Sequence, residues 1–245
     1  MQTSVASKPA VIADSLALFG TSSGRVLAHN YATAAGDLLP PPRDAGITRW
    51  EYQLRGAISA KPALIGSSGD VAGVVSQSGD VFFVDTLTGS GVGRAKIAGG
   101  AQAAPVADDA VMYIASLDQS VYAFQPSEAL LRWRYRTAAR LDRPIALHEG
   151  VLYVPVPGQG LTALDAATGD VIWISKDVSG SVIAVRNGEL IAFEAGHAQV
   201  IDARRGDVLE DIDLAGFERL IPTAFVDAPI YALGASGAVA RFEPR

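Results

Sequence analysis

A short turn motif returns along this chain about every 40 residues, and this period restricts the fold more than any other feature. Its clearest copy is LTALDAATGDVIW, residues 161–173. Gly169 suits a turn position with positive φ, and Asp165 and Thr168 have short side chains that can hydrogen-bond turn amides. A small or apolar residue, here called the repeat marker, stands two positions before the residue that starts each turn. The markers are Ala28, Phe83, Ala123, Ala163, Val200 and Ala240.

The copies differ in how much of the motif they keep. Trp133 follows its marker by ten residues, as Trp173 does, whereas Glu210 stands at that position in the fifth copy. In the first copy Trp50 comes 22 residues after the marker, because an insertion at 36–49 separates the strands of that repeat. The copies therefore belong to one repeating unit, in which individual motif residues are replaced or displaced.

Each repeat also carries a short apolar strand pattern ahead of its turn, as in VMYIAS (111–116) and VLYVPV (151–156). Four short strands in about 40 residues are typical of one blade of a β-propeller. We therefore predict an all-β chain, a single β-propeller domain over residues 1–245 with about six four-stranded blades. The sixth repeat ends on its third strand, so we expect a last blade of three strands, or one completed by a strand from elsewhere.

Composition excludes several classes of function. The chain has no cysteine, which removes disulfides, thiolate metal sites and cysteine nucleophiles. Its net charge of −6 makes nucleic acid a poor partner. No apolar run approaches the roughly 20 residues of a membrane-spanning helix, and the start lacks the pattern of a signal peptide. His29, His148 and His197 occupy unrelated repeat positions, so we interpret them as surface or turn residues.

The run from Ala163 to Trp173 resembles the tryptophan-docking repeat of PQQ-like β-propellers, and partial copies extend the resemblance over nearly the whole chain. In that family the tryptophan packs between neighbouring blades, which implies a structural role. The residues assigned this docking role are Ala163, Asp165, Thr168, Gly169, Trp173, Trp133 and Trp50.

The same resemblance leaves several functions open. Quinoprotein enzymes of the family have longer chains, an adjacent-cysteine disulfide and a metal-binding set, none of which is recognisable in this sequence. The resemblance therefore implies the BamB-like, non-enzymatic branch, and we expect no catalytic residue, cofactor or metal. A PQQ-dependent or sugar-binding enzyme relative and a sensor domain of a larger signalling system stay as alternatives.

Two segments are candidates for binding a partner. One lies in the insertion, where three consecutive prolines favour an extended segment: Leu38, Leu39, Pro40, Pro41, Pro42 and Arg43. The other is an outer strand whose basic residues alternate and share one face: Arg132, Arg134 and Arg136. A solvated loop and a charge-protected edge strand are the structural alternatives.

These observations together predict a protein-binding scaffold. The expected partner is a protein, part of a membrane-associated or multi-subunit assembly. The expected location is the bacterial cell envelope or periplasm after removal of a leader, with the cytoplasm as the alternative.

Overall fold

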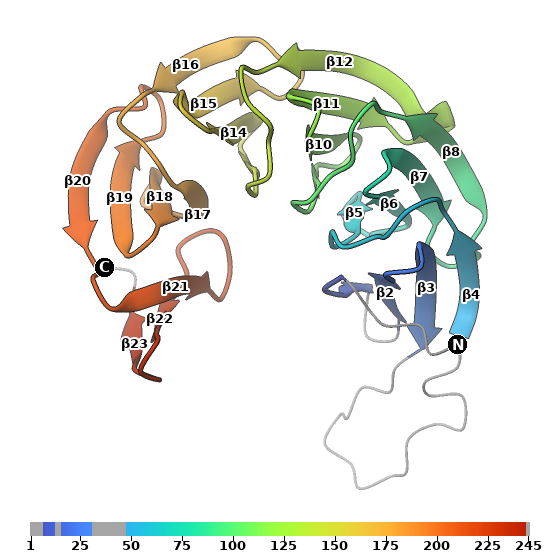
Figure 1. The fold of residues 1–245 in the computed structure, drawn as a ribbon, viewed down its shortest axis with the longest axis horizontal. Helices are drawn as coiled ribbons and strands as arrows, with labels where there is room; N and C mark the ends of the chain where they lie inside the picture. The colour runs from blue at the N-terminus through green and yellow to red at the C-terminus, as the bar shows by residue number, and fades with distance from the viewer. Residues whose placement is uncertain (1–6, 13–15, 31–47, 244–245) are drawn as a thin grey trace, which may run out of the picture. The chain divides into compact units, whose positions relative to one another are not determined.

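The computed structural model describes residues 7–12, 16–30 and 48–243. These residues form six antiparallel sheets, each built from strands that follow one another along the chain (Figure 1). The all-β propeller class predicted from the repeat is confirmed. By its contacts the chain divides into two compact units, Met1–Asp142 and Arg143–Arg245, which are described separately. The single domain over 1–245 stays a prediction.

Unit 1 contains three four-stranded blades. Blade 1 consists of β1 (Ala10–Ile12), β2 (Leu16–Gly20), β3 (Arg25–Asn30) and β4 (Thr48–Gln53). Blade 2 consists of β5 (Ala63–Ile65), β6 (Val71–Val75), β7 (Asp80–Asp85) and β8 (Gly91–Lys96). Blade 3 consists of β9 (Val106–Ala107), β10 (Met112–Ser116), β11 (Ser120–Gln125) and β12 (Leu130–Arg136), with the short 3-10 helix η2 (Ser127–Ala129) before β12.

Unit 2 contains two four-stranded blades and one of three strands. Blade 4 consists of β13 (Ala146–His148), β14 (Val151–Val156), β15 (Gly160–Asp165) and β16 (Val171–Ser175). Blade 5 consists of β17 (Ser181–Arg186), β18 (Glu189–Glu194), β19 (His197–Asp202) and β20 (Val208–Asp213). Blade 6 consists of β21 (Phe217–Pro222), β22 (Ile230–Gly234) and β23 (Val239–Phe242), so within the described residues it has three strands, as the sequence predicted.

The cores of both units lie between neighbouring blades. In unit 1, Phe83 of blade 2 packs with Met112 and Ile114 of blade 3. In unit 2, Leu161 of blade 4 packs with Leu190 of blade 5. The middle strand β6 of blade 2 is buried because blade 1 packs on one face of its sheet and blade 3 on the other, which explains why β6 is a continuous apolar run rather than an alternating pattern.

Every repeat marker lies on the third strand of its blade, and in the first five blades the ladder to the fourth strand changes register immediately after it. The change falls after Ala28, Phe83, Ala123, Ala163 and Val200 in the first five blades. Such a β-bulge increases the local twist of the pair. The residue opposite the marker on the outer strand is the tryptophan position of the motif. Trp173, for example, pairs with Ala163, which stands ten residues before it.

Candidate partner-binding surfaces and blade-docking contacts

The turn that follows each aspartate of the motif is built by side-chain hydrogen bonds. Asp165 Oδ1 accepts from the backbone N–H groups of Ala167 and Thr168 at 2.8 and 2.9 Å. Gly169 donates its N–H to the Asp165 carbonyl at 2.8 Å and has a φ of +80°, a conformation that glycine adopts without strain. The short polar residues of the motif thus set the geometry of the turn.

The corresponding turn of blade 2 shows the electrostatic consequence. Asp85 Oδ1 accepts from the Thr88 N–H at 2.7 Å, from the Thr88 hydroxyl at 2.8 Å and from the Leu87 N–H at 3.1 Å. The hydrogen bonds from Thr88 lower the pKa of Asp85 below its ordinary value, with a smaller contribution from Leu87. The carboxylate form is therefore the one that fits this turn.

In blade 4 the outer-strand tryptophan packs on the turn of the next blade. Trp173 Nε1 donates to the carbonyl oxygen of Ala203 at 3.1 Å, and Ala203 directly follows the turn aspartate Asp202. A Cβ atom placed on Gly206 would lie 2.5 Å from Trp173 Cε3, so only glycine leaves room for the ring. The ring centroid is also 6.0 Å from that of Tyr153.

Blade 1 repeats this arrangement with different residues. Trp50 Nε1 donates to the Thr86 carbonyl at 2.9 Å, and a Cβ atom on Gly89 would lie 2.6 Å from Trp50 Cγ. The tryptophan and the turn glycine therefore belong to one contact, which joins two blades that are neighbours in sequence.

The same outer-strand position is also defined in blades 3 and 2. Trp133 stands opposite its marker on β12, and its ring centroid is 5.8 Å from that of Tyr113. In blade 2 the tryptophan position is Gly93, and a Cβ atom there would lie 2.4 Å from the Ala129 nitrogen and from the Pro126 oxygen. Blade 3 has Gln125 in place of the turn aspartate. The backbone of that turn fills the space beside Gly93 that a tryptophan ring occupies in blades 1 and 4.

The three arginines predicted to share a face lie on β12, an edge strand of its sheet. Arg134 is tied to its own blade, because its Nε and Nη2 donate to the Ser120 hydroxyl at 3.0 and 2.8 Å and its guanidinium lies 4.9 Å from the centre of the Tyr122 ring. Arg132 makes a single hydrogen bond of 3.3 Å to Gln125, and both Arg132 and Arg136 are exposed.

The equivalent outer strand of blade 2 shows what is unusual about β12. There the buried Asp80 lies 3.3 Å from Lys96 and 3.9 Å from Arg94. Burial alone would raise the pKa of Asp80, but the Arg55 N–H, Lys96 and Arg94 together lower it.

Blade 3 has Ser120 at the position of Asp80, and Asp118 lies 3.8 Å from Arg134 instead. Across the described ranges of the chain, Arg132 and Arg136 take part in no ion pair. Leu130 and Leu131, at the start of the same strand, are 53% and 45% exposed. The strand β12 therefore presents uncompensated positive charge next to apolar surface.

The second predicted segment, Leu38, Leu39, Pro40, Pro41, Pro42 and Arg43, lies outside the described residues.

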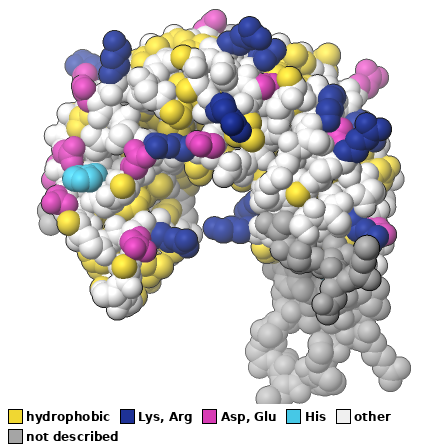
Figure 2. Space-filling view, viewed as in Figure 1, with side chains coloured by type: hydrophobic (Ala, Val, Ile, Leu, Met, Phe, Trp, Pro, Cys, Tyr) yellow, Lys and Arg dark blue, Asp and Glu magenta, His cyan; other side chains and the backbone are white. Residues whose placement is uncertain are grey.

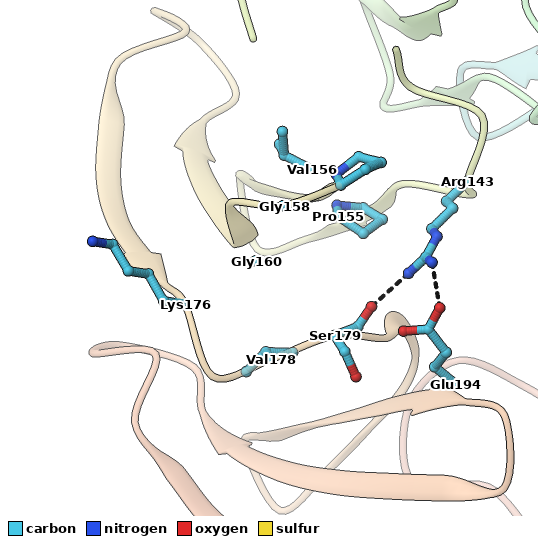
Figure 3. A pocket seen from close by; sticks show the side chains of 10 residues that line it. Arg143, Pro155, Val156, Gly158, Gly160, Lys176, Val178, Ser179 and Glu194 are labelled. Carbon is cyan, nitrogen blue, oxygen red and sulfur yellow. Dashed lines mark hydrogen bonds and ion pairs between the residues drawn. The ribbon is translucent and has the colours of Figure 1, made fainter. Parts of the chain in front are cut away.

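A cavity of about 340 Å³ lies between turns of blades 4 and 5. Arg143 Nη1 donates to the Ser179 carbonyl at 2.6 Å, and Nη2 forms an ion pair with Glu194 (Figure 3). In the same view the side chain of Lys176 extends away from this pair. Because Glu194 neutralises Arg143, this ion pair joins two blades and adds no net charge to the cavity.

Lys and Arg side chains are interspersed with Asp and Glu on the face drawn in Figure 2. Among the residues that the structure describes, no group of three His, Asp or Glu side chains could hold a metal ion. Within the same residues, no helix has the length and apolar character that crossing a bilayer requires.

Comparison with known proteins matches this chain to one family model and to many solved structures, two of which are given below. The sequence profile of the family described as "Outer membrane protein assembly factor BamB" matches residues 42–226, about three quarters of the chain. The structure of BamB from Moraxella catarrhalis is similar with a TM-score of 0.70 and 18% identity, over 98% of this chain and 76% of that one.

The computationally designed protein Ika8 is similar with a TM-score of 0.76 and 11% identity, over 99% of this chain and 72% of that one. No curated protein sequence matches this chain. At these identities the two solved structures support the fold alone.

Proposed function

Because this chain belongs to the BamB family of PQQ-like propellers, we propose that it is a non-enzymatic scaffold that binds other proteins in the bacterial cell envelope. The relatives' description as an outer membrane protein assembly factor supports both the class of partner and the compartment. The expected partner is a protein of a membrane-associated or multi-subunit assembly.

The observation that carries this proposal is the composition of β12. Within the described residues, Arg132 and Arg136 are exposed, form no ion pair and share a strand with exposed leucines. Lys96, the counterpart of Arg136 on β8, is neutralised by Asp80, and the counterpart of Arg132 is the uncharged Val92. Arginine is enriched at protein interfaces, and an unpaired positive strip speeds association with an acidic surface. The partner surface that fits β12 is therefore acidic with an apolar centre.

The test compares capture by the tagged protein and by the double variant Arg132→Glu/Arg136→Glu from an envelope extract of the source organism, with mass spectrometry to identify what is bound. The control is Lys61→Glu/Arg205→Glu, which changes the net charge equally at two other exposed positions. We expect the β12 variant to capture at least about tenfold less partner, and added salt to weaken wild-type capture. Equal capture by the two variants, or no specific capture by the wild type, would contradict the proposal.

The proline-containing segment is tested in the same extract by deleting residues 38–47. A contact of this segment with the partner would reduce capture, while the thermal midpoint should change little because the length of an inserted segment affects stability weakly. Unchanged capture would restrict binding to other surfaces.

A further inference from the structure

A second cavity, of about 520 Å³, lies in unit 2 on turns of blades 4, 5 and 6. Its wall includes Tyr153, Ile172 and Val226, and its rim carries Arg204 and Asp227. Ile172 and Val226 are 48% and 47% exposed, so apolar surface faces solvent here. Cavities of this volume suit a ligand with a few apolar groups and a few polar anchors.

Tyr153 supplies a polar anchor that the chain itself leaves unused. The residue is only 2% exposed, and in the described part of the chain its hydroxyl makes no hydrogen bond. The hydroxyl oxygen is not among the fully buried, unpartnered polar atoms of the described residues, and Tyr153 lines the cavity, so a ligand there can accept a hydrogen bond from it. Burial, together with the charge of Glu149, raises the pKa of Tyr153, which keeps the hydroxyl protonated and therefore able to donate.

The preceding repeat shows how the same position is satisfied elsewhere. Tyr113 stands 40 residues before Tyr153, and its hydroxyl donates to Asp108 Oδ2 at 2.8 Å. The residue 40 positions after Asp108 is His148, whose ring lies 5.9 Å from that of Phe225. The substitution of aspartate by histidine thus leaves the Tyr153 hydroxyl without the acceptor that its counterpart has.

The wall of the cavity is fixed by backbone hydrogen bonds rather than left to a free loop. Val185 donates its N–H to the Phe225 carbonyl at 2.7 Å, and Asp227 donates its N–H to the Val185 carbonyl at 2.9 Å. Asp227 Oδ1 also accepts from the Asn187 N–H at 2.9 Å. These bonds attach the β21–β22 connection to blade 5, so the cavity has a defined shape before a ligand enters.

We propose that this cavity binds an extended peptide segment of a protein partner, with one large apolar side chain against Ile172 and Val226 and one backbone carbonyl oxygen at the Tyr153 hydroxyl. The inference rests on the proposed protein-binding function and names a second contact for it. A peptide fits this chemistry because its carbonyl is a neutral acceptor, whereas the rim charges have both signs and favour neither an anion nor a cation. Arg204 and Asp227 can then bind the adjacent carbonyl and N–H groups of the same segment.

The test titrates the protein with N-acetyl-leucinamide, a minimal peptide with one large apolar side chain. Methyl resonances of Ile172, Val185 and Val226 are followed by NMR. We expect these signals to shift with saturation, and Tyr153→Phe to weaken binding about fivefold, because it removes one hydrogen bond and preserves the ring. Tyr113→Phe is the matched control and should leave the affinity unchanged.

A second pair of variants tests the apolar wall. Ile172→Ser should weaken binding severalfold, whereas Ile174→Ser, which changes an exposed residue on the same strand away from the cavity, should not. Absence of shifts at the three methyl groups, or equal affinity of wild type and Tyr153→Phe, would overturn the inference. Because the probe requires no partner protein and no residue of β12, this result is independent of the capture experiment that tests the proposed function.

Discussion

Replacement of Trp173 by alanine should lower the free energy of unfolding of unit 2 by about 2–4 kcal/mol. Truncation of a fully buried tryptophan costs about 3–5 kcal/mol, and Trp173 is half-buried, which reduces this figure. Loss of the Nε1 hydrogen bond adds about 1 kcal/mol, because the Ala203 carbonyl loses its donor. Trp173→Phe, which keeps a ring but loses the hydrogen bond, should fall between the wild type and alanine.

The assay is urea unfolding followed by far-ultraviolet circular dichroism, since fluorescence would report the deleted indole itself. Ile172→Ala is the control, because Ile172 is exposed on the same strand and should cost less than about 0.5 kcal/mol. A cost below about 1 kcal/mol for Trp173→Ala would show that the ring contributes little to the contact between blades 4 and 5, and would refute the docking interpretation.

Three further results follow from the same contacts. Gly206→Ala should destabilise the protein more than Gly158→Ala in thermal unfolding, because both glycines have positive φ but only at Gly206 would the new Cβ meet the Trp173 ring; equal costs would contradict this. The pKa of Asp80 is lowered in the folded state, so the stability that its carboxylate contributes is present above about pH 4 and lost as the pH falls. The loss of unfolding free energy in Asp80→Asn relative to the wild type should therefore shrink between pH 7 and pH 3. A loss that stays constant with pH would contradict this role of Asp80. In hydrogen exchange, amides of β23 should exchange faster than those of β15, which has a strand on each side, and equal protection would show that β23 is paired on both edges.

The features that could be predicted from the sequence are those that depend on short stretches of chain. The turn from Asp165 to Gly169 follows from hydrogen bonds within five residues, and the ten-residue step to Trp173 corresponds to one ladder pair. A local pattern of this kind repeats visibly, and its repetition indicates the number of blades.

The cavity at Tyr153 could not be predicted in the same way. His148 was interpreted as a surface or turn residue, but its importance lies in replacing Asp108, the acceptor used one repeat earlier. The burial of the Tyr153 side chain and the wall at Val226 depend on packing between separate blades, which no single stretch encodes. The difference between Asp80 and Ser120 behind the outer strands could have been found by aligning blades 2 and 3 position by position.

The most direct test of the central claim, that this propeller is a protein-binding scaffold, measures the affinity of the captured envelope protein for wild type and for Arg132→Glu/Arg136→Glu at two salt concentrations. The account predicts a loss of at least about tenfold at low salt that becomes smaller at high salt, because the arginines act through charge. Equal affinity of the two proteins at low salt would contradict the assignment of β12 as the binding surface.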